Sequence, residues 1–197
     1  MLVAAMALAI GLVPRPAAAD ASATVRGFYD ALLDVMRNGP TLGPKGRYDT
    51  LGPVIDRTFD VPYMTRVAVG ASWESLPKEQ QAALTQAFAH YIAATYAERF
   101  DHFSGQKFEL LGELPRASGA VVDSRIVRAD GTPVSIRYLM RQDGGDWRVA
   151  DVYLSGTISE LATRHSEFSS ILERQGADGL IATLNRKTDA IVATPRS

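Results

Sequence analysis

The spacing of apolar residues changes at Ser104-Gly105 from that of a helix to that of a strand, and this change constrains the fold most. Before it, residues 78–103 carry a broad apolar stripe with a helical period. After it, residues 133–142 alternate apolar and polar side chains. A helix buries every third or fourth residue and a strand every second one, so the two patterns are not interchangeable. The chain therefore passes from helices into a block of strands.

Four helices are expected before the strands and two after them. The apolar spacing predicts the first four at 24–37, 49–59, 63–70 and 78–103. Residues 41–48 are rich in Gly and Pro and are expected to form a loop. After the strands, Thr157-Ile158-Ser159-Glu160 has the pattern of a capping box and predicts a helix at 157–174. Gly176 ends that helix, and residues 178–187 form the last one.

The central block is expected to contain four strands. The two-residue period predicts them at 107–114, 119–129, 133–142 and 146–154. Asp130-Gly131 and Gly144-Gly145 supply the positive φ angles that tight hairpins need. Strands joined by such short turns form an antiparallel meander. We therefore expect an α+β fold whose helices pack on one face of a curved four-stranded antiparallel sheet.

Residues 1–19 have the pattern of a secretory signal peptide. An uncharged apolar run from Leu2 to Val13 precedes the small residues Ala17-Ala18-Ala19. The run is too short to span a bilayer, which takes about 20 apolar residues. No Lys or Arg precedes it, so a retained N-terminal anchor is the alternative. We expect cleavage before Asp20 and a single domain over residues 20–197.

The composition excludes several classes of protein. The chain has no cysteine, so neither disulfides nor thiolate metal sites stabilise it and one hydrophobic core must do so. Lys and Arg number 21 against 22 Asp and Glu, and no stretch is strongly basic, so no nucleic-acid-binding surface is expected. No second long apolar segment follows the N-terminal one. The mature chain is expected to be soluble and monomeric.

The motifs of catalysis and metal binding are missing from the sequence. It has no Gly-x-Ser-x-Gly, His-Glu-x-x-His, P-loop or Gly-x-Gly-x-x-Gly pattern. His90 and His102 lie twelve residues apart on one predicted helix, so they cannot share a metal ion. Asp151, followed by Asp123, is the best candidate for a general base, although a structural role fits each better. We expect no catalytic residue, metal or cofactor. A small enzyme using one of these carboxylates and a structural envelope protein are the alternatives.

Apolar and aromatic side chains gather on the inward faces of the predicted helix at 78–103 and of the strands. They form either a packed core or the wall of a ligand cavity, and composition does not separate the two. The inward-facing residues on the helix and strands are Phe88, Ile92, Tyr96, Phe100, Phe108, Leu110, Ile136, Tyr138, Met140, Trp147 and Val149.

Two stretches of the chain carry ordered motifs. Residues 59–100 contain Phe-Asp, a Met-x-Arg helix, a Val-Gly-x-x-Trp turn, and then Phe and Tyr-Ala. Residues 146–184 contain Trp-x-Val-x-Asp-Val, a following Gly, the Arg and Phe of a helix, and Gly-x-x-x-Leu-Ile-x-x-Leu. In this order the motifs resemble the MlaC family of periplasmic lipid-transfer proteins, also called toluene-tolerance auxiliary proteins.

The resemblance implies a wedge-like α+β fold that encloses a lipid in an apolar cavity. It also implies a periplasmic location and, as an auxiliary component of an ABC transporter system, exchange of lipid with transport complexes of the inner and outer membranes. It implies no catalytic residue and no cofactor. The lipid-binding residues expected on this basis are Val67, Phe88, Ile92, Tyr96, Phe100, Phe108, Leu110, Ile136, Tyr138, Met140 and Val149.

The identity of the lipid depends on the branch of the family. Ala-Val-Gly-x-x-Trp and Gly-Thr-Ile-Ser-Glu-Leu-Ala are similar to the hopanoid-associated branch, HpnM. One extra residue between Arg164 and Phe168 departs from the phospholipid branch. Either a hopanoid or a phospholipid is therefore expected as the cargo.

Overall fold

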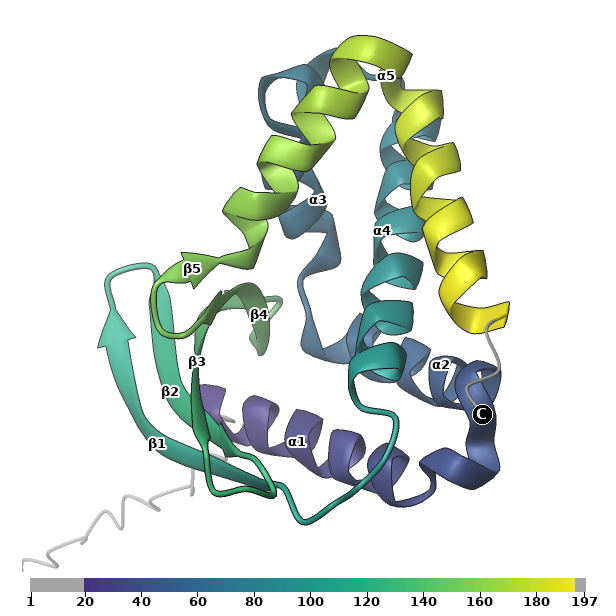
Figure 1. The fold of residues 1–197 in the computed structure, drawn as a ribbon. Coiled ribbons are helices and arrows are strands. Elements are labelled where there is room, and N and C mark those ends of the chain that lie inside the picture. Colours follow the sequence, from purple (N-terminus) through teal and green to yellow (C-terminus); the bar gives the residue numbers. More distant parts are fainter. Residues whose placement is uncertain (1–19, 194–197) are drawn as a thin grey trace, which may run out of the picture.

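The computed structural model describes residues 20–193, and the predicted signal peptide at residues 1–19 lies outside this range. Helices precede the strands and one long helix follows them, as Figure 1 shows. In chain order, the elements are α1 (Ala21–Arg37), α2 (Gly39–Thr58), α3 (Val61–Val69), the 3-10 helix η1 (Gly70–Ser75), α4 (Lys78–Arg99), β1 (Lys107–Arg116), β2 (Gly119–Val127), β3 (Pro133–Asp143), β4 (Asp146–Leu154), β5 (Ile158–Ser159) and α5 (Glu160–Ala193).

The sheet is an antiparallel meander in the order β1-β2-β3-β4-β5. The α+β class and the four long strands are confirmed, but the predicted total of four strands is one too few. The two residues of β5 pair with the end of β4, where Tyr153 lies opposite Ser159. Ser155 and Gly156, with φ of 51° and 76°, turn the chain back to make this pairing. A two-residue strand is too short to show a periodicity, so the sequence pattern did not reveal it.

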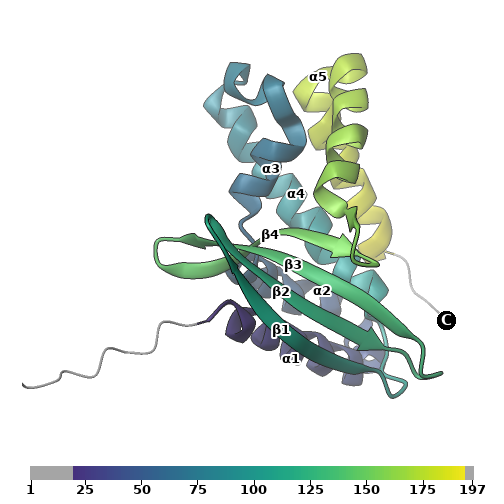
Figure 2. The same cartoon turned by 90° about the vertical axis from the view of Figure 1, so that its left-hand side faces the viewer.

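Helix α1 and the sheet form the lower part of the molecule. The strands curve around α1, and α3, α4 and α5 rise from this base (Figures 1 and 2). Phe28 of α1 contacts Tyr138 of β3 edge to face, with ring centroids 6.5 Å apart. Tyr29 contacts the same tyrosine at 5.9 Å, and its hydroxyl lies 2.6 Å from Ser124 Oγ. The core between α1 and the sheet is therefore densely aromatic.

Helix α2 differs from the prediction. Residues 41–48, expected to form a loop, are helical apart from a kink at Gly43, whose φ is 63° and ψ 178°. Pro44 follows the kink, where a new helical segment begins and the missing N–H of proline costs little. Buried Arg47 fixes the segment by donating to the carbonyls of Ala97 and Gly39, at 2.9 and 3.1 Å. Gly and Pro here mark a kink rather than a loop.

The boundaries of α4 and α5 also differ from the predicted ones. Helix α4 ends at Arg99 instead of residue 103. The N-cap of α5 is Ser159, whose Oγ accepts from the N–H of Ala162 at 2.9 Å, so the capping box expected at Thr157 is wrong by two residues. The break at Gly176 is confirmed as a kink with φ of 68°, and the second half of α5 runs on to Ala193.

Candidate functional site

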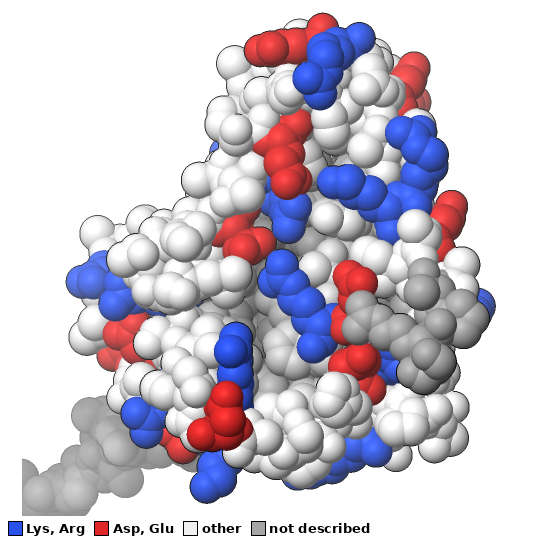
Figure 3. All heavy atoms as spheres, viewed as in Figure 1, with Lys and Arg blue, Asp and Glu red and all other residues white. Residues whose placement is uncertain are grey.

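An apolar pocket lies where α4 and the first half of α5 meet β4 and α3. Its volume is about 60 Å³. Figure 3 shows a hollow in the face of the molecule that carries both halves of α5. The apolar part of the lining consists of Phe59, Met64, Phe88, Ile92, Tyr96, Val152, Leu154 and Leu161.

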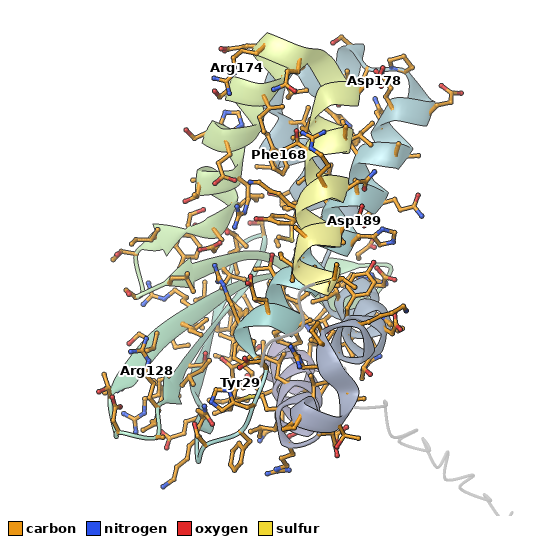
Figure 4. All side chains as sticks on the ribbon, turned by 45° about the vertical axis from the view of Figure 1, so that its right-hand side comes forward. Tyr29, Arg128, Phe168, Arg174, Asp178 and Asp189 are labelled. Atoms are coloured by element: carbon orange, nitrogen blue, oxygen red, sulfur yellow. The ribbon has the colours of Figure 1, made fainter. Side chains whose placement is uncertain are left out.

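Helix α4 supplies one continuous wall of this pocket. Phe88, Ile92 and Tyr96 follow one another at intervals of four residues, which places them on one face of the helix. The ring of Phe88 meets Phe168 of α5 edge to face at 5.2 Å and closes the upper end. Figure 4 shows Phe168 between the helices in the upper part of the molecule. The wall is therefore built by the periodicity of α4 and by the packing of α5 against it.

The lower end of the pocket is an aromatic floor. The ring of Phe59 lies 5.7 Å from that of Tyr96, and Phe28 contacts both rings at 5.2 and 5.1 Å. Burial raises the pKa of Tyr96, so its phenol stays neutral at physiological pH. The floor therefore presents rings without charge, an environment suited to hydrocarbon.

The rim of the pocket is charged. Arg99 of α4 and Glu160 and Arg164 of α5 line it together with Tyr91 and Thr95. Arg164 forms salt bridges to Glu167 at 2.7 Å and to Glu160 at 3.4 Å. Its guanidinium carbon lies 5.3 Å from the centroid of the Tyr91 ring. The pocket is thus apolar inside and polar where it opens, which suits an amphipathic ligand.

The structure brings three of the eleven predicted lipid-binding residues together at this pocket: Phe88, Ile92 and Tyr96. Four others are buried in the sheet outside the pocket lining, namely Ile136, Tyr138, Met140 and Val149. Phe100, Phe108 and Leu110 pack against the core as partly buried side chains, and Val67 on α3 is exposed. A lipid contact for each of these residues stays a prediction.

Sequence reasoning missed the part of the site that α5 contributes. Leu161 and Arg164 lie three residues apart at the start of α5, so they share a face of it. Nothing in the sequence places that face opposite α4. Tyr91 lies in the apolar stripe predicted for residues 78–103 but was not predicted to bind lipid, and Arg99 lies off that stripe. The spacing of both from Tyr96 was the available signal. Phe59, which follows α2, is brought in by a backbone bridge to Val149.

The two carboxylates considered as catalytic bases both have structural partners. Asp151 is buried, and its oxygens accept from the N–H groups of Val152 and Leu161 at 2.7 and 3.1 Å. The Ser159 hydroxyl donates to it at 2.7 Å. Asp123 forms a salt bridge with Arg137 at 2.7 Å. Asp151 thus fastens the start of α5 to β4, and neither carboxylate lines the pocket.

A second hollow lies on the other side of Phe59. It is larger, at about 710 Å³, and more open, with Trp73, Lys78 and Arg148 among its lining residues. Its size comes largely from open groove, so it offers less enclosure than the smaller pocket. Phe59 lines both hollows and separates them.

Within residues 20–193, no helix combines the length and apolarity needed to cross a bilayer. The same residues contain no group of three or more His, Cys, Asp or Glu side chains arranged to hold a metal ion.

Comparisons with known proteins agree with this architecture. A structure of a phospholipid-binding protein from Ralstonia solanacearum, in complex with a phospholipid, superposes with a TM-score of 0.73 at 24% identity, covering 87% of this chain and 98% of that one. The intermembrane phospholipid transport system binding protein MlaC of Haemophilus influenzae is 25% identical over 132 residues. That match spans 64% of this chain and 61% of the relative. The family model described as MlaC protein matches residues 26–186, and the chain therefore belongs to the MlaC family.

Proposed function

We propose that this protein is a non-enzymatic carrier that holds the apolar part of a membrane lipid, acyl or polycyclic, in the α4–α5 pocket and shuttles the lipid through the periplasm. The observation that carries the proposal is an apolar pocket with a charged rim in a member of the MlaC family. Exposing lipid tails to water costs about 0.8 kcal/mol per CH₂, so a carrier has to cover most of their length. A headgroup at the rim can remain in water.

Uptake of a lipid requires the pocket to widen. Its volume of about 60 Å³ corresponds to roughly two water molecules, far less than an acyl chain. The first half of α5 lies between Gly156 and Gly176, both with positive φ. Asp151 and the β4–β5 pairing hold the start of this segment, so the kink at Gly176 would allow its later part to swing away from α4 about that fixed start. Because Arg164 lies beyond the fixed start, such a movement would open the rim and the upper part of the apolar wall.

The lipid and the partners belong to the same proposal. The names of the Haemophilus and Ralstonia proteins favour a phospholipid. Resemblance to the hopanoid-associated branch favours a hopanoid. In either case transport complexes of the inner and outer membranes would load and unload the carrier, because release into water is unfavourable. Mass spectrometry of lipid extracted from natively purified protein identifies which lipid is carried.

Transfer between vesicles tests the carrier function itself. Donor vesicles contain a self-quenched fluorescent phospholipid, and acceptor vesicles contain none. The mature protein is expected to increase the rate of dequenching in proportion to its concentration. A rate equal to that of vesicles alone, with protein shown to be folded by circular dichroism, would reject the proposal.

Export is tested separately. The pattern of residues 1–19 predicts that the exported protein begins at Asp20. Intact-mass analysis of protein from the periplasmic fraction is expected to show this N-terminus. A mass that includes Met1, on a form that sediments with membranes, would contradict a free carrier.

A further inference from the structure

Basic side chains from three segments lie at or beside the opening of the α4–α5 pocket. Arg99 comes from α4 and Arg164 from the first half of α5, and both line the opening. Lys187 comes from the second half of α5, and its Nζ lies 5.5 Å from the centroid of the Tyr91 ring. Arg164 approaches the same ring. Figure 3 shows basic side chains beside the hollow on this face.

The charges of these three residues are not equally compensated. Arg164 is paired with both Glu160 and Glu167, so its positive charge and the two carboxylates largely offset one another. Within residues 20–193, neither Arg99 nor Lys187 forms a salt bridge, and both side chains are exposed. Arg99 on the pocket lining and Lys187 beside the lining residue Tyr91 therefore carry charges that no salt bridge to a described carboxylate offsets.

We propose that Arg99 and Lys187, with Arg164 held between the two acidic residues, bind the phosphodiester of the lipid headgroup. The carrier would then select lipids that bear a phosphate over lipids with the same tails and none. Guanidinium and ammonium groups bind phosphate oxygens by charge-assisted hydrogen bonds. The inference rests on the carrier function proposed above, because it needs the tails to occupy the apolar part of the pocket.

A comparison of two lipids isolates the phosphate. Delipidated mature protein is titrated with phosphatidylglycerol and with diacylglycerol of the same acyl chains, each displacing a fluorescent fatty-acyl probe. The wild type is expected to prefer phosphatidylglycerol by on the order of tenfold, the effect of about one hydrogen bond to a charged group. The double variant Arg99→Gln, Lys187→Gln is expected to lose this preference and to bind diacylglycerol as the wild type does.

Arg128→Gln provides the matched control. Arg128 lies next to the β2–β3 turn, far from the helices that form the pocket, as Figure 4 shows. This variant removes one exposed arginine charge and is expected to keep the preference for phosphatidylglycerol. Because Arg99 and Lys187 are exposed, the double variant is expected to melt within about 4 °C of the wild type.

The outcomes separate this inference from the carrier function. Equal affinity of the wild type for the two lipids, or an unchanged preference in the double variant, would overturn the phosphate site. Neither result would contradict the proposed carrier function. Failure of both lipids to displace the probe would overturn both proposals. If inorganic phosphate bound as tightly as phosphatidylglycerol, Arg99 and Lys187 would form a site for free phosphate. That result would overturn the assignment to the lipid headgroup.

Discussion

At the scale of single residues, Asp151 occupies the junction between β4 and α5. Its carboxylate accepts from two backbone N–H groups and from the Ser159 hydroxyl. The Ser159 hydroxyl in turn accepts from the N–H of Ala162, the third residue of the helix. One buried carboxylate thus determines where α5 begins, and hence where Arg164 stands relative to the pocket.

Substitution Asp151→Ala tests this structural role. The change removes the carboxylate that accepts hydrogen bonds from the buried N–H of Leu161 and from the N–H of Val152. This loss is expected to lower the free energy of unfolding by about 3 kcal/mol. For a domain of this size the melting temperature is expected to fall by roughly 6–12 °C. Asp123→Asn, which breaks an exposed ion pair, is expected to change it by less than about 4 °C. Unchanged melting of Asp151→Ala with loss of a measurable enzymatic activity would contradict the account.

Two isoleucines distinguish the pocket wall from the core. Ile92 lines the pocket, whereas Ile136 is buried in β3 outside the pocket lining. Ile92→Trp is expected to reduce co-purified lipid with little change in the melting temperature of delipidated protein. Ile136→Trp is expected to overpack the core and destabilise the fold by about 1–3 kcal/mol. Delipidation is required because a bound ligand raises apparent stability.

The opposite result would place the lipid tails elsewhere in the molecule. If Ile136→Trp lowered the lipid content without lowering the melting temperature, the tails would lie against β3 rather than between α4 and α5. That result would agree with the position expected for Ile136 from the sequence pattern and would contradict the pocket described by the structure.

Single-residue patterns revealed only part of the site, for a physical reason. Phe88, Ile92 and Tyr96 could be grouped because one helix fixes their spacing. Tyr138 and Met140 share an inward face of the sheet in the same way, but the aromatic rings of α1 fill the space in front of Tyr138. Whether an inward side chain meets a ligand or a neighbour depends on tertiary packing, which a periodic pattern does not contain.

At the scale of elements, the kinks of α2 and α5 control how the helices reach the pocket. Local sequence identified Gly176 correctly as a break, since glycine is the residue that adopts positive φ without strain. It also predicted that a helix resumes at residue 178, but placed the end of that helix at 187 instead of Ala193. In α2, buried hydrogen bonds from Arg47 stabilise a helix through a segment that composition assigns to a loop. In α2, long-range contacts therefore override local propensity.

A pair of glycine substitutions tests the kink in α5. Gly176→Ala places a Cβ where φ is 68°, which costs about 1–2 kcal/mol although no atom crowds the new group. The melting temperature is expected to fall by roughly 2–8 °C. Gly27→Ala in α1 also meets open space but has helical backbone, so it is expected to raise stability by about 0.5–1 kcal/mol. Equal effects of the two substitutions would show that the kink is not required.

At the scale of the whole molecule, α1, α4 and the sheet meet through the buried Tyr29 and Tyr138 and the partly buried Tyr96. Burial raises the pKa of Tyr29, Tyr96 and Tyr138 above the ordinary value of 10.0. Tyr29 and Tyr138 lie between α1 and β3, and Tyr96 contacts Phe28 from α4. The packing of α4 against α1 and the sheet therefore depends on tyrosine side chains that remain protonated.

The pH dependence of stability follows from this direction of shift. Below about pH 10 the phenols are protonated in both the folded and the unfolded chain, so their contribution is fully present. Above it the unfolded chain releases protons that the folded chain retains, and stability falls by up to about 1.4 kcal/mol per pH unit for each tyrosine. Urea unfolding between pH 8 and 11.5 measures the slope. Tyr138→Phe is expected to reduce this slope, and an identical slope in that variant would contradict the assignment.

The position of the lipid tail is the most direct test of the account. A phospholipid carrying a photoreactive diazirine near the end of one acyl chain is bound to the mature protein, irradiated, and mapped by tandem mass spectrometry. The account predicts crosslinks to residues that line the pocket, from Phe88 to Tyr96 on α4 and near Leu161 on α5. Crosslinks confined to the open groove around Trp73, or to the outer face of the sheet, would contradict it.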